Sequence, residues 1–259
     1  MALIEFHDVW KSFGPKTVYQ GLNLSIEAGE ALTIVGGSGV GKSVMLKMLI
    51  GLLTADRGQI LFDGEHIEHM PPKQLARVRQ RVGMLFQGAA LFDSLTVREN
   101  VAYGLREHHR MAEEAISERV AWALSLVGLP GVEAMMPADL SGGMRKRVGL
   151  ARTIALKPEV LLYDEPTTGL DPINTTRINH LIVSLQRALK ITSIVVTHDM
   201  GSAFFVSTRM AMVHKGRIIA SGTPDDFRNT DNPLVRNFIE GNAPEDEDMA
   251  ALVARQAGG

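Results

Sequence analysis

The segment Gly36-Gly37-Ser38-Gly39-Val40-Gly41-Lys42-Ser43 fits the pattern G-x-x-x-x-G-K-[ST] of a phosphate-binding loop. Residues 31–35 before it are apolar and β-branched, which predicts a buried strand, and residues 44–50 after it read as a helix. This arrangement suits phosphate, because glycines let backbone N–H groups converge and the helix start adds partial positive charge. In this context a glycine-rich turn that binds nothing is the weaker interpretation.

The last two residues of the loop carry the side-chain chemistry that the pattern predicts. Lys42 would reach the β- and γ-phosphates of a nucleotide, and the hydroxyl of Ser43 would ligate Mg²⁺. The backbone from Gly36 to Ser43 would cradle the phosphates. The loop alone therefore predicts a nucleotide site without specifying the reaction.

The composition limits the classes of protein that need to be considered. The chain has 259 residues, of which 45% are hydrophobic and 22% charged, so a packed core is expected. A net charge of −2 argues against nucleic acid as the main partner. The absence of cysteine excludes disulfides and thiolate metal sites. No signal peptide or long apolar run is evident, so we expect a soluble protein that meets a membrane only through a partner.

The first part of the chain is predicted to mix antiparallel strands with one strand–loop–helix unit. Residues 2–10 alternate weakly and suggest an edge strand, and residues 22–27 alternate more clearly as a half-buried strand. Residues 59–64 form a further strand and turn, and residues 81–87 read as a buried strand that ends in a polar residue.

The middle of the chain is predicted to be helical. Residues 97–105 and 112–127 carry apolar residues at three- and four-residue spacings. A third helix follows, with either Ser141 or Asp139 as its N-cap. We therefore expect a helical subdomain over 88–158, inserted into an α/β core.

The α/β core is predicted to resume after this insertion. Apolar strands over 159–163 and 191–197 flank an amphipathic helix over 173–190, and residues 210–220 suggest a hairpin. Strands that alternate with helices predict a mostly parallel sheet covered by helices.

The predicted domains are a core over 1–87 and 159–225, the helical insertion, and a C-terminal extension over 226–259. This extension becomes acidic from about residue 244, and Met249, Leu252 and Val253 then follow at helical spacing. A disordered solubilising segment is one interpretation of this tail.

Two acids follow the apolar strand over 159–163. Asp164 would hold Mg²⁺ opposite Ser43, directly or through water. Glu165 would lie closer to the γ-phosphate, where a carboxylate can orient or deprotonate the attacking water. Paired acids at the end of a strand can also be a solvated loop start, so the pair alone does not decide the function.

A second glycine-bearing helix start occurs at Leu140-Ser141-Gly142-Gly143. Its N–H groups and hydroxyl could contact another phosphate, although an ordinary capped helix explains this stretch equally well in isolation. With the other motifs, it resembles the signature motif of the nucleotide-binding subunits of ABC transporters. The order of motifs also agrees with that family. The resemblance implies an α/β P-loop NTPase fold, with a RecA-like core, an antiparallel β subdomain and an inserted helical subdomain.

The resemblance also implies a head-to-tail dimer of two copies. The loop of one copy and the signature of the other would enclose each ATP, with Ser141 and Gly143 contacting the γ-phosphate across the interface. Asp171 resembles the residue that links the two sites.

Four further residues receive roles from the resemblance. Glu165 is similar to the catalytic base, and His198 to a switch residue that contacts the γ-phosphate; its place after a strand puts it at the ligand-binding edge of the sheet. Gln87 is similar to the residue that senses Mg²⁺ and joins the core to the helical subdomain. Phe13 matches by position an aromatic residue that stacks on adenine, although a role in the core is the alternative.

Several longer stretches, over 85–97, 100–108 and 142–152, resemble the ATPases of Mla/Mce-type lipid transporters. That branch implies a cytoplasmic ATPase at the bacterial inner membrane, a permease dimer, an MCE-domain lipid carrier and a STAS-domain regulator. It also implies that a C-terminal extension can reach the neighbouring ATPase copy near the regulator, which is the alternative for the acidic tail. Its activity would be ATP hydrolysis coupled to phospholipid transport between the inner and outer membranes. The alternatives are another ABC importer, such as one for polar amino acids, a soluble ABC-type ATPase in DNA repair or translation, and an inactive binding module.

Overall fold

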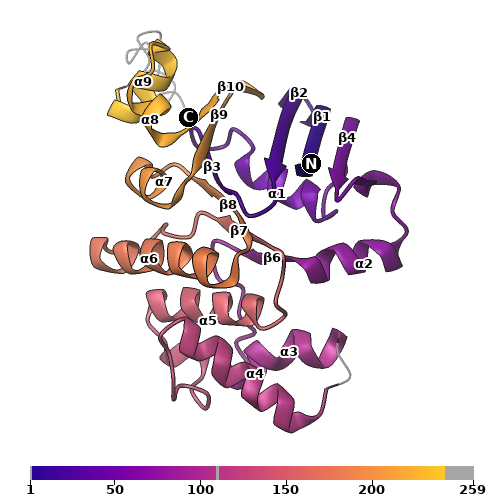
Figure 1. Cartoon of the computed structure of the whole chain (residues 1–259), viewed down its shortest axis with the longest axis vertical. Helices are drawn as coiled ribbons and strands as arrows, with labels where there is room; N and C mark the ends of the chain where they lie inside the picture. The colour runs from indigo at the N-terminus through magenta and orange to yellow at the C-terminus, as the bar shows by residue number, and fades with distance from the viewer. Residues whose placement is uncertain (1, 109–110, 243–259) are drawn as a thin grey trace, which may run out of the picture.

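The computed structural model describes residues 2–108 and 111–242, and these ranges form two sheets and several helices (Figure 1). The larger sheet has six strands in the order β10-β9-β3-β8-β7-β6. These strands are β3 (Ala31–Val35), β6 (Val82–Leu85), β7 (Val160–Asp164), β8 (Thr192–Thr197), β9 (Arg209–His214) and β10 (Arg217–Gly222). β3 pairs in parallel with β8 and β9, and β7 with β6 and β8, while β9 and β10 form an antiparallel hairpin. The mostly parallel sheet and the hairpin predicted from the sequence are both confirmed.

The smaller sheet is antiparallel and has the strand order β2-β1-β4-β5. Its strands are β1 (Ala2–Phe13), β2 (Lys16–Glu27), β4 (Arg57–Phe62) and β5 (Glu65–His66). β1 pairs with both β2 and β4, so the prediction of an edge strand near the N-terminus is wrong. The alternation of side chains reports which face of a sheet is buried, whereas it carries no information about the number of neighbouring strands.

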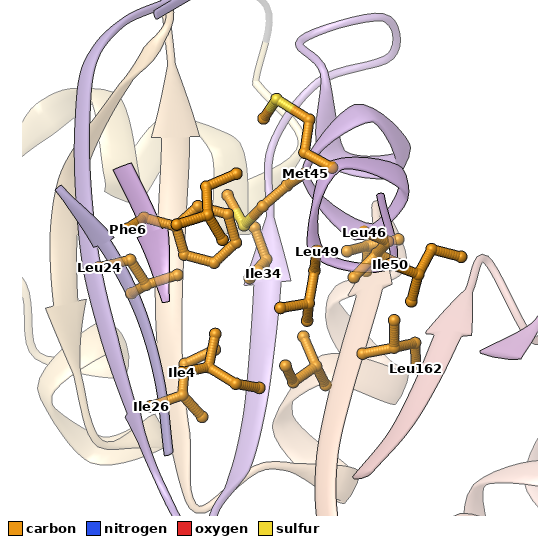
Figure 2. Packing of buried hydrophobic residues seen from close by; sticks show 14 of the residues in the cluster. Ile4, Phe6, Leu24, Ile26, Ile34, Met45, Leu46, Leu49, Ile50 and Leu162 are labelled. Carbon is orange, nitrogen blue, oxygen red and sulfur yellow. The ribbon is translucent and has the colours of Figure 1, made fainter. Parts of the chain in front are cut away.

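Helix α1 (Lys42–Leu49) lies between the two sheets and joins them into one core. Figure 2 shows how this core is filled from both sides. The labelled residues are Ile4, Phe6, Leu24 and Ile26 from the antiparallel sheet, Ile34 and Leu162 from the parallel sheet, and Met45, Leu46, Leu49 and Ile50 from α1 and its end. Because α1 starts at the phosphate-binding loop, this packing fixes the loop relative to both sheets.

The helices of the middle segment pack on one another at one end of the molecule (Figure 1). They are α3 (Val97–His108), α4 (Glu113–Leu126) and α5 (Gly142–Ile154), with the short 3₁₀ turn η2 (Pro137–Asp139) before α5. The three predicted helices are therefore present. Ser141 is the N-cap of α5, because its Oγ accepts a hydrogen bond of 3.2 Å from the N–H of Met144.

The remaining helices cover the larger sheet or extend from it. They are α2 (Pro72–Arg81), α6 (Pro172–Leu189), α7 (Met200–Val206), α8 (Pro224–Arg228) and α9 (Pro233–Glu240), with the 3₁₀ turn η1 (Ile67–His69) before α2. Val35, Met210, Phe227 and Val235 share a small core that joins α8 and α9 to the sheet. The predicted domain boundaries remain predictions, and the acidic tail from about residue 244 lies outside the described residues. No helix within the described ranges combines the length and apolarity needed to cross a bilayer.

Candidate functional site

The phosphate-binding loop has a backbone that only glycine can adopt at two of its positions. Gly36 has φ +152°, and a Cβ there would lie 2.5 Å from the carbonyl oxygen of Val213. Gly41 has φ +105°, and a Cβ there would overlap the side chain of Val18. The carbonyl oxygen of Gly41 also accepts a hydrogen bond of 2.6 Å from Tyr19 Oη, which ties the loop to β2. These contacts fix the shape of the loop.

Lys42 is buried at the centre of the loop, with 6% of its surface exposed. Its Nζ donates hydrogen bonds to the carbonyl oxygens of Gly36 (2.7 Å) and Gly37 (3.1 Å), and it lies 3.5 Å from Glu165 Oε1. Burial lowers the pKa of Lys42 below that of a free lysine, and the charge of Glu165 opposes this effect. A buried cation beside the N–H groups at the start of a helix provides a concentrated positive charge that suits an anion.

Ser43 and Asp164 meet although 121 positions separate them in the sequence. Ser43 Oγ donates a 2.6 Å hydrogen bond to Asp164 Oδ1, and Asp164 is buried at the end of β7. A hydroxyl and a carboxylate are the hard oxygen ligands that Mg²⁺ prefers. The donor set therefore fits the predicted magnesium site.

Glu165 occupies a left-handed backbone conformation, with φ +48°, immediately after β7. Its N–H donates to the carbonyl of Val196 (2.9 Å), and its Oε2 lies 3.0 Å from Nδ1 of His198. The hydroxyls of Thr168 and Thr197 also donate to this oxygen, at 3.2 and 3.3 Å. The Glu165 side chain is 12% exposed, so its orientation is set by neighbouring polar groups from β8 and the following turn.

One pocket of about 400 Å³ contains most of the predicted site residues. Its lining consists of Phe13, Lys16, Val18, Ser38, Gly39, Gly41, Lys42, Ser43, Val44, Gln87, Glu165, Thr168 and His198. Phe13 is 45% exposed at the end of β1, so the alternative of a core role for this ring is wrong. Its ring lies 5.2 Å from Nζ of Lys11. An accessible ring at one end and the glycine loop at the other suit a base linked to phosphates.

Sequence reasoning missed three polar residues that line this pocket or hydrogen-bond to Glu165. Thr197 ends β8 directly before His198, and Thr168 lies in the turn after the paired acids. Lys16 lines the mouth of the pocket at the start of β2. The position of Thr197 was a usable signal, because it precedes a histidine at the carboxyl edge of a predicted parallel strand.

The residues of the second glycine-bearing helix start do not line this pocket in the part of the chain that the structure describes. Ser141 is exposed and caps α5, and a Cβ on Gly143 would lie 3.1 Å from Asn174 Oδ1. Asp171 is exposed and caps α6 through the N–H of Asn174 (3.0 Å), and these hydrogen bonds lower the pKa of its carboxyl. The two predicted groups of phosphate ligands are therefore separate within one chain.

Comparisons with known proteins agree with this geometry. Residues 19–168 match the family described as "ABC transporter". The chain is 40% identical to the intermembrane phospholipid transport system ATP-binding protein MlaF of Haemophilus influenzae, over 93% of this chain and 91% of that protein. It is also 40% identical to the probable ribonucleotide transport ATP-binding protein mkl of Mycobacterium tuberculosis, over 98% of this chain and 72% of that protein.

Solved structures extend the same likeness to the fold. The dimeric ATP-binding cassette MJ0796, in a post-hydrolysis state bound to ADP and Pi, has a TM-score of 0.78 and 30% identity, over 85% of this chain and 98% of that chain. The resemblance and the P-loop fold predicted from the sequence are thus confirmed. The chain belongs to the ABC transporter family, in which it is an ATP-hydrolysing subunit.

Proposed function

We propose that this ATPase powers the transport of phospholipid between the inner and outer membranes of a bacterium. The observation that carries the proposal is the near end-to-end likeness to the phospholipid transport protein MlaF, combined with a pocket lined by Lys42, Ser43, Glu165 and His198. The equal identity to mkl, which is named for ribonucleotide transport, makes a ribonucleotide the second candidate cargo.

ATP binds with its adenine at Phe13 and its phosphates on the loop from Gly36 to Ser43. The half-exposed ring supports a stacking contact, and the loop supplies N–H groups at the start of α1. Lys42 turns its ammonium from the carbonyls of the loop toward the β- and γ-phosphates. Ser38, Gly39 and Val40 belong to the same cradle.

Ser43 and Asp164 would hold Mg²⁺, with Gln87, which lines the pocket together with Ser43, as a further oxygen donor. A bound ion would supply positive charge that offsets the charge developing on the phosphates. The 2.6 Å contact between Ser43 Oγ and Asp164 Oδ1 supports this assignment, because two hard donors already face one another.

Glu165 is the base that orients the attacking water and accepts its proton. Thr168, Thr197 and His198 support this role because they hold one carboxylate oxygen, Oε2. His198, with a side chain 52% exposed, reaches the γ-phosphate from the edge of the sheet. Positioned donors of this kind supply much of the catalysis in phosphoryl transfer.

A second copy completes the site in a head-to-tail dimer. Ser141 and Gly143 of one copy contact the γ-phosphate bound by the other, and Asp171 lies at the junction of the two sites. The exposure of Ser141 and Asp171, and the separation of all three residues from the pocket, support this arrangement, as does the dimeric state of MJ0796. The side chain of Ile173, 66% exposed beside Asp171, also suits an interface. ATP favours the closed dimer because it binds that state better, and hydrolysis reopens it.

The permease dimer docks near the segment from Gln87 to Val101. Phe92 and Tyr103 are 42% and 44% exposed, and their ring centroids lie 4.7 Å apart, so this region presents an aromatic surface. The buried Asn100 shapes the adjoining loop by hydrogen bonds to Phe92, Leu95 and Thr96. This docking places the chain on the cytoplasmic face of the inner membrane, with a STAS-domain regulator and an MCE-domain lipid carrier as further partners.

The test is transport by the chain assembled with its permease in proteoliposomes. We expect ATP-dependent movement of labelled phospholipid to an acceptor, and phosphate release that increases with the permease. Labelled ribonucleotide moved in place of lipid would overturn the proposed cargo. ATPase activity that no permease alters would favour a soluble ABC-type ATPase.

A further inference from the structure

Helix α5 carries cationic side chains that donate hydrogen bonds to backbone carbonyls of separate segments. These bonds run from Arg145 to Leu140, from Lys146 to Glu165, Pro166 and Thr168, from Arg147 to Val127 and Gly128, and from Arg152 to Ala89 and Ala90. Helix α5 is thus tied to several loops. The contact of Lys146 is the one that reaches the turn of the predicted base.

Lys146 is buried, with 7% of its surface exposed. Its Nζ donates to the carbonyl oxygens of Pro166 (2.7 Å) and Thr168 (2.8 Å), and more weakly to that of Glu165 (3.4 Å). Three carbonyls of one turn therefore converge on one ammonium group. Burial lowers the pKa of Lys146, and the charge of Glu165 opposes this effect.

The turn that Lys146 holds has a conformation that needs support. Glu165 has φ +48°, a left-handed backbone conformation that side-chain-bearing residues adopt only at an energetic cost. The turn closes with its own hydrogen bond of 3.3 Å from the Thr168 N–H to the Glu165 carbonyl. Thr168 also donates through its hydroxyl to Glu165 Oε2, so the position of the turn sets the position of the carboxylate. The ammonium of Lys146 satisfies carbonyls that would otherwise point into a closed space.

We propose that Lys146 is a positioning residue that fixes Glu165 and makes it follow the start of α5. Lys146 lies about one turn after Ser141 and Gly143 on the same helix. When those residues close on the ATP of the sister copy, the ammonium carries the shift to the Glu165 turn of its own chain. Closure of the sister copy's ATP site would then align Glu165 in the site of this chain. The inference rests on the proposed function, in which Glu165 is the base and the signature acts across the dimer.

Arg147 provides a matched control on the same helix. Its Nη1 donates to the carbonyls of Val127 (3.3 Å) and Gly128 (3.1 Å), and burial lowers its pKa as it does for Lys146. These carbonyls lie at the end of α4, away from the pocket residues. Substitution of Arg147 therefore removes the same kind of bond without touching the turn of Glu165.

The experiment compares Lys146→Met, Lys146→Arg and Arg147→Met in the ATPase assembled with its permease. We expect Lys146→Met to lower kcat by about 10- to 100-fold, since small misplacements of a catalytic group have effects of this size. KM and the directly titrated ATP affinity should stay within about twofold, because Lys42 and its loop are unchanged. Lys146→Arg should recover most of kcat, and Arg147→Met should keep kcat within about twofold.

A double-mutant cycle separates this proposal from the proposed function. In a Glu165→Gln background, Lys146→Met should not lower the residual turnover further, because its effect passes through Glu165. If Glu165→Gln alone keeps wild-type turnover, the proposed function is contradicted at Glu165, before Lys146 is considered. If that role holds but Lys146→Met lowers kcat no more than Arg147→Met, or lowers residual turnover equally in both backgrounds, Lys146 is only structural. Should Lys146→Met not fold, Lys146→Gln, which keeps two donors and loses the charge, gives the same comparison.

Discussion

The two glycine-bearing helix starts of this chain differ in how their polar groups are used. At the start of α1, Lys42 and Ser43 contact side chains or carbonyls around one pocket, and both reach residues at the end of β7. At the start of α5, the hydroxyl of Ser141 is exposed and contacts only the backbone of its own helix in the described structure. The difference supports the proposal that one chain carries most of one hydrolytic site, around Lys42 and Ser43, and a second group of donors, at Ser141, that acts on the site of another copy. We call these the hydrolytic half and the donor half.

The largest expected effect on turnover comes from removing the proposed base, Glu165, from the hydrolytic half. Glu165→Gln should still bind ATP and should lower kcat by about 10²- to 10⁴-fold, the usual contribution of a general base. Phosphate release measures turnover, and size-exclusion chromatography with ATP should show accumulation of a closed dimer. Glu159→Gln, at the other end of β7 and paired with Arg81 at the surface, is the control and should change turnover less than twofold. Equal turnover in the two variants would remove Glu165 from the mechanism.

The next largest effect is expected from removing the buried ammonium of Lys42, which should weaken ATP binding. Lys42→Ala should weaken ATP affinity by about 10- to 100-fold, in line with about 1.5–3 kcal/mol for a hydrogen bond to a charged group. Isothermal titration with a non-hydrolysable ATP analogue measures the affinity. Lys47→Ala, on the same helix and outside the pocket lining, should bind normally. Unchanged affinity in Lys42→Ala would argue against its phosphate contact.

The donor half should respond in a different way. Ser141→Ala should lower kcat by about tenfold in the assembled dimer and leave the ATP affinity of the isolated chain unchanged, because its phosphate belongs to the sister copy. It should also reduce stability by about 1 kcal/mol through loss of the cap. Thr223→Ala loses a comparable cap on α8 and should leave kcat unaltered. A drop in the affinity of the monomer would contradict the division into two halves.

The smallest effect is expected at the adenine end. Phe13→Ala should weaken ATP affinity by about three- to tenfold, as for an aromatic contact of about 0.5–1.5 kcal/mol. Phe92→Ala removes a ring of similar exposure outside this pocket and should not change the affinity of the isolated chain. A Phe13 variant that binds ATP as tightly as the wild type would assign the ring another role.

Much of the fold could be predicted because local patterns agree with the tertiary structure. Strands β3, β7 and β8 are fully buried, and Asp164 and the loop that leads to Lys42 and Ser43 lie at the carboxyl ends of β7 and β3. The topology of parallel strands alone therefore brings these motifs together. Ser141, by contrast, could be assigned a role only by family resemblance, since its proposed phosphate contact lies in another chain.

The features that sequence reasoning missed depend on contacts between distant segments. The central place of β1 depends on β4, which pairs with it from beyond the phosphate-binding loop. The hold of Lys146 on the Glu165 turn links residues about 20 positions apart, and a lysine in a helix that is rich in cations gives no sign of burial. Helix α2 was also missed, since its four basic residues obscure a single buried Val78.

The bond from Tyr19 Oη to the carbonyl of Gly41 has a consequence for ligand selection. It fastens the hairpin that carries Phe13 to the glycine loop, so the spacing between ring and loop resists adjustment. A ligand must then match this fixed spacing in order to contact both the ring and the loop. We therefore expect adenosine or inorganic triphosphate alone to engage one end only, and a nucleoside triphosphate to be favoured because it can reach both ends.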